Sequence, residues 1–197
     1  VLLERVFNTL KIQAKKKGLE FLYTAANALP QWVETDPTRL TQILLNLLGN
    51  ALKFTAHGHV QLQVSYTQTE DSHEGTLQMQ ISDTGPGIPP VVLGKIFNPF
   101  YQLHNKQAQP SGHALQGNGL GLAITQGLVK KWQGHIEVNS SEGKGSTFKV
   151  SIPVAISRQA NAAPVRQDQT GHEQTIVPMR ILVVDDHAMN RMVATAT

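Results

Sequence analysis

The sequence has no cysteine among its 197 residues. This absence excludes disulfide bonds, thiolate catalysis and cysteine metal ligands, and it is compatible with a reducing compartment. The sequence also has no apolar run near the roughly 18 residues that a membrane-spanning helix needs, and no charged and then apolar leader at its start. Because the chain opens abruptly on Val1, we expect it to be a piece of a longer protein. The spans and signals of that parent are not excluded by what is missing here.

Neither sign of charge predominates, because 17 lysines and arginines face 14 aspartates and glutamates, and the formal net charge is +3 at pH 7. The sharpest basic run, Lys15-Lys16-Lys17, follows a helical pattern and precedes Gly18. We interpret this run as cations near a helix C-terminus that a glycine closes. No aromatic or basic stripe continues it, so we expect no nucleic-acid partner.

What the sequence does contain is a series of helical and strand patterns that predicts an α+β fold. Apolar spacing predicts helices over 1–17, from an N-cap at Asp36 to a stop at Gly58, and over 122–132. Alternating residues predict strands over 19–23, 59–67, 76–82, 136–138 and 147–152. This order favours a two-layer α/β sandwich, in which one mixed sheet packs on helices.

The composition divides the chain into three parts. Residues 1–153 carry the helical and strand patterns and suffice for one domain. Residues 154–178 lose these patterns, and their Ala-, Gln- and Pro-rich composition predicts a flexible linker. Residues 179–197 hold a buried-strand run that ends in Asp185 and Asp186 and are too few for a complete domain.

The helix after Asp36 carries the first polar pattern of chemical interest. Asn46 and Asn50 lie four residues apart and project from one face of the helix, with Lys53 one turn further. In an isolated helix, such an asparagine pair among leucines is more often a buried polar contact. Carboxamide oxygens also suit Mg²⁺, a hard cation that prefers oxygen ligands and substrate phosphates.

Three glycine-containing loops follow this helix. The first, directly after a strand, is Asp83-Thr84-Gly85-Pro86-Gly87-Ile88, where the aspartate can accept a hydrogen bond from an amino group and the glycines admit a ligand ring. The second opens a helix and is Gly117-Asn118-Gly119-Leu120-Gly121-Leu122, whose free backbone N–H groups favour a phosphate chain. The third, between two strands, is Gly143-Lys144-Gly145-Ser146-Thr147. Taken singly, each loop is explained as well by a plain turn or hinge.

These motifs, with Phe97-Asn98-Pro99-Phe100 between the first two loops, follow the order of the N box, the F box and the three glycine boxes of histidine kinases. Residues 1–153 therefore resemble the catalytic domain of the histidine protein kinases. The resemblance implies the Bergerat ATP-binding fold, a mixed sheet layered on helices, with a mobile ATP lid from about Tyr101 to Gln116. The polar, glycine-rich composition of residues 84–121 agrees with a functional or disordered loop.

The resemblance also implies roles for single residues, with ATP and Mg²⁺ as ligands. Asn50 would bind Mg²⁺, with Asn46 and Lys53 near the phosphates, and these three are the expected catalytic residues. The other expected nucleotide contacts are Asp83 at the adenine amino group, Gly85, Gly87 and Ile88 around the pocket, Phe97 and Phe100 at the lid hinge, Gly117, Gly119, Leu120, Gly121 and Leu122 at the end of the lid, and Thr147 at the pocket floor.

One position separates the histidine kinases from their hydrolysing relatives of the gyrase, Hsp90 and MutL types. Those relatives carry a glutamate four residues before the magnesium-binding asparagine, and it acts as the general base that activates water. In this sequence the position is Asn46, and an amide cannot act as a base. The sequence therefore favours phosphoryl transfer over ATP hydrolysis.

The last residues carry a second, partial resemblance. The run from Ile181 to Arg191 is similar to the first strand and helix start of receiver domains, where Asp185 and Asp186 would help to bind Mg²⁺. The phosphorylated aspartate of that family lies further along and is not in this sequence. A kinase domain followed by a receiver domain implies a hybrid sensor kinase that works through a phosphorelay.

The histidine that accepts the phosphoryl group is the main residue missing from the pattern. In the family it lies in a His-Glu-rich motif, and none of the eight histidines of this sequence has such neighbours. The resemblance places it on a separate dimerisation domain of the same protein. It further implies a homodimeric bacterial parent, anchored in the inner membrane with this domain in the cytoplasm, and a downstream phosphotransfer protein or response regulator. The alternative from another class is a nucleotide-sensing module without transfer activity.

Overall fold

The computed structural model describes residues 2–25, 29–69, 74–102 and 118–157. The elements, in chain order, are α1 (Leu2–Lys16), β1 (Glu20–Ala25), β2 (Val33–Glu34), α2 (Pro37–Phe54), β3 (His59–Gln68), β4 (Glu74–Asp83), α3 (Pro90–Leu93), α4 (Gly121–Lys131), β5 (His135–Ser141) and β6 (Gly145–Ile156). Several sequence predictions lie outside the described residues, namely the expected lid from 103 onwards with Gly117, the linker beyond 157, and Asp185 and Asp186.

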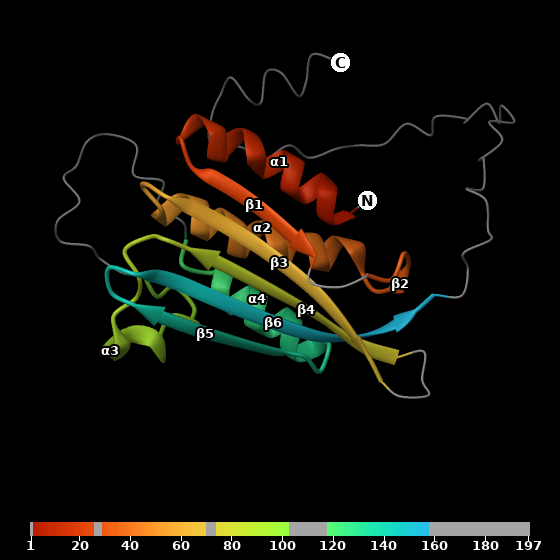
Figure 1. The fold of residues 1–197 in the computed structure, drawn as a ribbon. Coiled ribbons are helices and arrows are strands. Elements are labelled where there is room, and N and C mark those ends of the chain that lie inside the picture. Colours follow the sequence, from red (N-terminus) through yellow and green to blue (C-terminus); the bar gives the residue numbers. More distant parts are fainter. Residues whose placement is uncertain (1, 26–28, 70–73, 103–117, 158–197) are drawn as a thin grey trace, which may run out of the picture. The chain divides into compact units, whose positions relative to one another are not determined.

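The strands form one mixed sheet. Its order is β1-β3-β4-β6-β2, and β5 also pairs with β6. Strand β1 runs parallel to β3, whereas the other pairs are antiparallel. Helices α1, α2 and α4 cover one face of this sheet (Figure 1). The predicted α+β sandwich of a mixed sheet on helices is therefore confirmed.

The core lies between α2 and the sheet. Leu44 and Leu48 of α2 are fully buried, as are Leu62 of β3, Ile81 of β4 and Val150 of β6 on the sheet side. Burying one such side chain contributes roughly 1.5–3 kcal/mol, so this layer holds α2 firmly against the strands. The position of any functional group on α2 is thereby fixed relative to the ends of β4 and β6.

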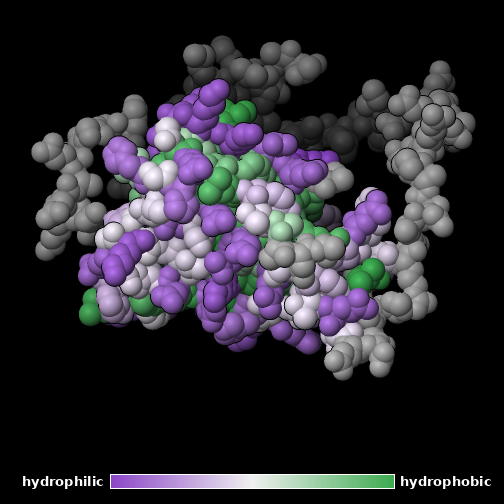
Figure 2. All heavy atoms as spheres, viewed as in Figure 1, coloured by the Kyte–Doolittle hydropathy of each residue, from purple (hydrophilic) through white to green (hydrophobic). Residues whose placement is uncertain are grey.

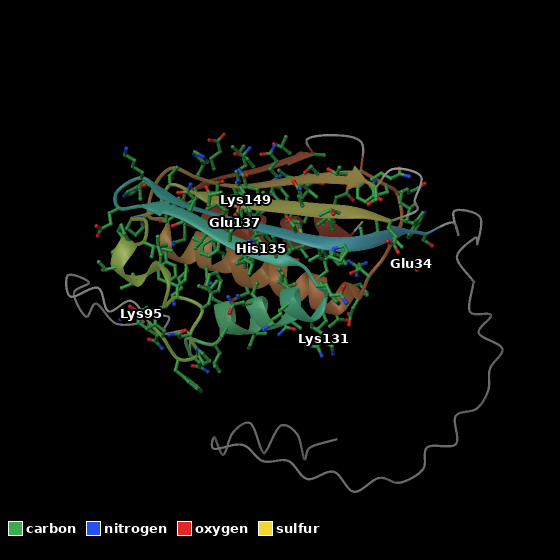
Figure 3. The ribbon with its side chains drawn as sticks, turned by 90° about the horizontal axis from the view of Figure 1, so that it is seen from below. Glu34, Lys95, Lys131, His135, Glu137 and Lys149 are labelled. Carbon is green, nitrogen blue, oxygen red and sulfur yellow. The ribbon has the colours of Figure 1, made fainter. Side chains whose placement is uncertain are left out.

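The opposite face of the sheet is covered by no described helix and is polar. The residues between the buried positions of β3, β4 and β6 include Gln63, Gln80 and Ser151. In Figure 2, which views the domain from this side, hydrophilic surface dominates. Glu137 of β5 and Lys149 of β6 form an exposed ion pair here at 3.5 Å (Figure 3), a contact that contributes little at high solvent exposure.

Helix α2 begins as the sequence predicted and ends earlier. The Asp36 carboxylate accepts hydrogen bonds from the N–H groups of Thr38 and Arg39 at 2.9 and 3.0 Å, and Pro37 occupies the first turn. The helix stops at Phe54 because Thr55 turns to an extended conformation, so the prediction of a stop at Gly58 was wrong. None of the described helices combines the length and apolar content of a membrane span.

Two short elements were not predicted from the sequence. Strand β2, two residues long, pairs with the end of β6, and α3 forms a single turn at Pro90–Leu93 within the polar stretch after β4. Neither element is long enough to display a helical or alternating period, so the spacing of apolar residues predicts neither of them. Strand β6 continues to Ile156, so residues 154–156, predicted as the start of the linker, belong to the sheet. The Ser157 N–H donates to the Trp32 carbonyl at 3.2 Å.

The C-terminus of α2 is capped by a lysine distant in sequence. The Lys17 ammonium, at the end of α1, donates to the carbonyls of Leu52, Lys53 and Thr55 at 2.5, 3.0 and 3.1 Å. A cation in this place satisfies carbonyls that have no partner in the helix and complements the helix dipole. Of the three lysines in the basic run, Lys17 thus has a defined role in tertiary structure.

Replacing Lys17 with methionine should lower the free energy of unfolding by about 1–2 kcal/mol, since three charge-assisted hydrogen bonds at a partly exposed site are lost. Urea unfolding followed by circular dichroism measures this change. Lys16→Met removes the same charge one residue away and should leave the midpoint almost unchanged. Equal midpoints for the two variants would show that the ammonium at position 17 does not stabilise the end of α2.

Candidate functional site

Asp83 ends β4 and is half-buried near the C-terminal end of α2. One carboxylate oxygen accepts a hydrogen bond from the Gly85 N–H at 2.8 Å. Burial raises the pKa of Asp83 above its usual value, and backbone N–H groups of Gly85 and Ser146 oppose this rise in part. A half-buried, partly desolvated carboxylate is well suited to accept a hydrogen bond from a ligand.

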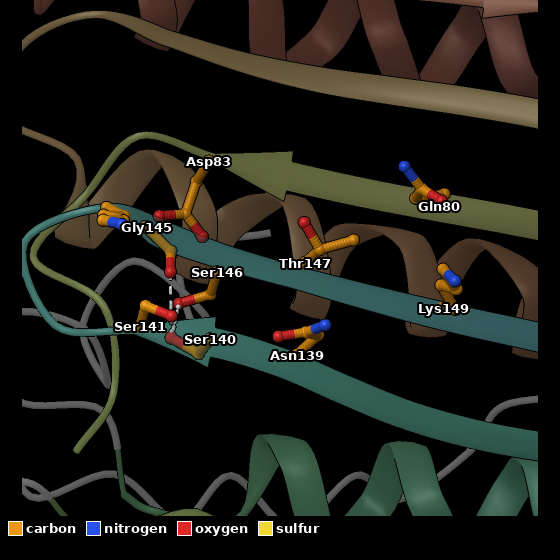
Figure 4. Close-up of a pocket in the computed structure, with 10 residues that line it drawn as sticks. Gln80, Asp83, Asn139, Ser140, Ser141, Gly145, Ser146, Thr147 and Lys149 are labelled. Carbon is orange, nitrogen blue, oxygen red and sulfur yellow. Dashed lines mark hydrogen bonds between the residues drawn. The ribbon is translucent and has the colours of Figure 1, made fainter. Parts of the chain in front are cut away.

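Ser146 is the residue that faces Asp83 across the sheet. The two are directly paired between β4 and β6, so their side chains lie on the same face, and Ser146 is buried at 8% exposure. Figure 4 shows Asp83 and Ser146 beside each other at the ends of these strands. Sequence reasoning did not select Ser146, although counting strand alternation back from the buried Phe148 would have found it.

Thr147, expected at the pocket floor, lies one residue further along β6. Its hydroxyl is 3.1 Å from that of Ser82, its partner on β4. Since successive residues of a strand point to opposite faces, Thr147 lies on the open face of the sheet, away from the side chains of Asp83 and Ser146. It also lines a shallow polar hollow of about 430 Å³, which Asp83, Ser140 and Ser146 border at the ends of their strands (Figure 4).

The loop after Asp83 packs tightly against its surroundings. A Cβ added to Gly85 would lie 2.8 Å from an Asp83 carboxylate oxygen and 3.3 Å from the Phe54 carbonyl, so only glycine leaves room for the carboxylate. Gly87 has a φ of +73°, and a side chain there would collide with the Ser141 carbonyl. The loop is therefore fixed between the end of α2 and the end of β5.

Asn46 joins α2 to the start of α4. Its amide nitrogen donates to the buried hydroxyl of Thr125 at 2.7 Å, and a Cβ at Gly121 would overlap the Asn46 amide oxygen. Helix α4 begins at Gly121, and no side chain of the described residues caps its first turn. Those free N–H groups together with the helix dipole favour an anion at this end.

Asn50 and Lys53 extend the same face of α2. Asn50 is half-buried, and within the described part of the chain its carboxamide has no hydrogen-bond partner. Lys53 is exposed, with its ammonium 5.0 Å from the centre of the Phe54 ring. An unpaired carboxamide oxygen near an anion-binding helix end is a suitable ligand for Mg²⁺, which is held by few protein oxygens together with substrate phosphates.

The ends of the expected lid lie close together. The Phe100 N–H donates to the Gly119 carbonyl at 2.9 Å, and Phe100 has a φ of +63°, which is unusual for a residue other than glycine. Phe97 and Leu122 pack against the core, whereas Phe100 is 73% exposed. Leu120 precedes the first turn of α4. The structure thus brings the residues before and after the expected lid to one place.

These parts form a strip along α2. The loop after β4 contacts its end at Phe54 and Thr55, and the start of α4 contacts Asn46. Along a helix that rises about 1.5 Å per residue, Asn46 and Thr55 are about 13 Å apart. A hydrogen-bond acceptor for a base lies at one end, an anion-binding helix start lies at the other, and Asn50 lies between them. The arrangement suits an extended molecule with a base and a phosphate chain.

Comparison with known families matches residues 35–156 to the histidine kinase-, DNA gyrase B- and HSP90-like ATPase family. The aerobic respiration control sensor protein ArcB of Escherichia coli strain K12 is 37% identical over 188 residues, which cover 95% of this chain and 22% of ArcB. The chain thus spans less than a quarter of the length of that relative.

Solved structures agree with this match. Full-length ShkA in complex with AMPPNP superposes with a TM-score of 0.63 and 31% identity, covering 79% of this chain and 30% of ShkA. The nucleotide-free catalytic domain of histidine kinase ThkA gives a TM-score of 0.57 at 26% identity, covering 77% of this chain and 91% of that domain. The chain therefore belongs to the histidine kinase-, DNA gyrase B- and HSP90-like ATPase family, and it carries the ATP-binding catalytic domain of a histidine kinase.

Proposed function

We propose that this domain binds Mg-ATP and transfers the γ-phosphoryl group to a histidine on a separate dimerisation domain. The observation that carries the choice of transfer over hydrolysis is Asn46. At the position where hydrolysing relatives have a catalytic glutamate, the chain has an amide that is engaged with Thr125 and packed against Gly121. An amide cannot take a proton from water, so no general base stands at this position to activate it.

In this proposal the residues around β4 recognise the base. Asp83 accepts a hydrogen bond from the adenine amino group, and Ser146, in place of Thr147, provides the pocket floor beside it. Gly85 and Gly87 keep the backbone free of side chains where the ring enters, and Ile88 and Phe97 line the apolar side. The support is the pairing of Asp83 with Ser146 and the tight packing of both glycines.

The phosphate chain lies toward α4. The first turn of α4, from Gly121 and Leu122, offers uncapped N–H groups to the phosphates, with Gly119 and Leu120 just before it. Gly117, which lies outside the described residues, is proposed as a further contact from the sequence motif alone. Asn50 holds Mg²⁺ and Lys53 adds positive charge. Bound Mg²⁺ would neutralise the charge of the phosphate oxygens. Phosphoryl transfer needs little covalent chemistry from the protein, so these residues act by positioning and by charge.

The wider protein is proposed on the strength of its relatives. Sensor and regulatory proteins match this chain over part of their length, among them the virulence sensor protein BvgS of Bordetella bronchiseptica. We assign this domain to a homodimeric bacterial sensor kinase anchored in the inner membrane, with the domain itself in the cytoplasm. The phosphorelay continues with a receiver domain that begins near residue 179 and has Asp185 and Asp186 as Mg²⁺ ligands. A downstream phosphotransfer protein or response regulator completes it.

The test is phosphorylation in trans. The folded chain, mixed with Mg-ATP and the histidine-containing domain of its own parent protein, should label that domain, and the label should be stable to base and labile to acid, as expected of phosphohistidine. Nucleotide binding without any labelling would instead support the nucleotide-sensing alternative. Multiple-turnover release of phosphate by the chain alone would support a gyrase-type ATPase and contradict the proposal.

A further inference from the structure

Ser140, near the end of β5, makes three contacts with two other segments around the proposed base pocket. Its half-buried hydroxyl is 2.8 Å from the Ile88 N–H, 2.9 Å from the Gly145 carbonyl and 3.0 Å from the Ser146 hydroxyl. Two of these distances join it to the start of β6, and the third joins it to the loop after Asp83. Figure 4 shows Ser140 on β5 next to Gly145 and Ser146 of β6, with dashed lines for the contacts between these residues.

The three contacts use the full hydrogen-bonding capacity of this hydroxyl. A serine hydroxyl has one hydrogen to donate and two lone pairs that accept. The hydrogen of Ser140 is donated to the Gly145 carbonyl, and one lone pair accepts from the Ile88 N–H. In the remaining contact Ser140 therefore accepts and Ser146 donates. The proton of Ser146 is thereby directed away from Asp83.

This orientation determines what Ser146 offers to a ligand. With its hydrogen engaged by Ser140, the Ser146 oxygen has only lone pairs left, next to a carboxylate that is also an acceptor. The pocket wall formed by Asp83 and Ser146 then matches a group rich in N–H donors, such as an exocyclic amine. The loop that carries Gly87 and Ile88 is held in place by the same hydroxyl.

From this geometry we infer that Ser140 is a positioning residue for nucleotide binding, which orients the Ser146 hydroxyl and fixes the loop at Ile88. The inference rests on the proposed nucleotide site. It is specific to Ser140, because its neighbour Ser141 is exposed, and within the described residues the Ser141 hydroxyl makes no hydrogen bond. Ser141 therefore provides a matched control of the same chemistry on the same strand.

The experiment is calorimetric titration of Mg-ADP into the whole chain, well below its melting temperature. Ser140→Ala should weaken binding about tenfold, the size expected for the loss of a buried hydrogen-bonding hydroxyl. Ser140→Cys keeps the side-chain size but hydrogen-bonds weakly, so it should show a similar loss. Ser140→Thr keeps the hydroxyl and should stay within about twofold of wild type, as should Ser141→Ala.

A second readout separates positioning from general stability. Amide hydrogen exchange at Ile88 should become faster in Ser140→Ala and Ser140→Cys, while exchange in the α2 core stays at the wild-type rate. If the wild-type chain bound no Mg-ADP, the proposed function itself would fail. If wild type bound it and the alanine and cysteine variants bound equally tightly, or if Ile88 exchange were unchanged, only the role of Ser140 would be overturned.

Discussion

Asp83→Asn should reduce the affinity for adenine nucleotides by at least about 100-fold, while the ligand-free domain becomes no less stable. The carboxylate is the acceptor proposed for the adenine amino group, and an asparagine can turn a donor N–H₂ toward that amine instead. A site built around a buried hydrogen bond loses much affinity when the pairing is wrong, because both groups are left unsatisfied. Calorimetric titration with ATP and with ADP measures the loss, which should be equal for both, since only the base is affected.

The effect on stability follows from the pKa of Asp83. Burial raises this pKa, so the native state holds the proton up to a higher pH than the unfolded chain does. Between the usual value and the raised value the native state binds more protons, and the free energy of unfolding falls as pH rises through that window. The ionised carboxylate is thus a cost to folding at neutral pH, and the neutral asparagine should remove that pH dependence.

Asp36→Asn is a matched control for this change. Asparagine caps helices about as well as aspartate, so this variant should keep both the melting temperature and nucleotide binding. Wild-type affinity should also decline as pH falls toward the raised pKa of Asp83, because protonation removes an acceptor. Wild-type ADP affinity in Asp83→Asn would refute the assignment of this residue to the base.

Asn50→Ala should lower the rate of histidine labelling in trans by about 100-fold or more. Its carboxamide is the proposed Mg²⁺ ligand on α2, and it has no other partner among the described residues. Loss of a metal ligand removes the charge neutralisation on which phosphoryl transfer depends. The rate with saturating Mg-ATP and labelled acceptor domain is the measurement.

Metal dependence distinguishes this role from a structural one. In the presence of EDTA, wild type and Asn50→Ala should bind ATP within about twofold of each other, because the remaining contacts are to base and phosphates. Asn8→Ala changes an exposed asparagine on α1 and should leave labelling unaffected. An Asn50→Ala variant that labels the histidine domain at the wild-type rate would require another Mg²⁺ ligand.

The sequence by itself predicted the helices and long strands well. Helix α2 is an example, because an N-cap at Asp36, a proline at 37 and an apolar stripe at helical spacing all indicate the same element. The alternation in 59–67 and 76–82 predicted β3 and β4 for the same reason, since one face of each strand is buried. Local periodicity records burial on one face, so it reveals long elements and misses β2 and α3.

The sequence also determined the family, since five motifs in a fixed order carry more information than any of them singly. That order needs no coordinates, and the family match over 35–156 agrees with it. The sequence could not determine which residue of the last motif lies beside Asp83. Thr147 and Ser146 are both hydroxyl residues after a glycine, and only the register of β6 against β4 distinguishes them.

Tertiary structure alone decided the contacts between residues far apart in sequence. Three side chains join segments that no local pattern relates. Lys17 binds the end of α2, Asn46 binds α4, and Ser140 binds both the loop after Asp83 and the start of β6. Strand pairing brings such residues together, and a shift of one residue would turn every side chain to the other face. The motifs name the ligand chemistry of this domain, and the register of its sheet decides which hydroxyl lies beside Asp83.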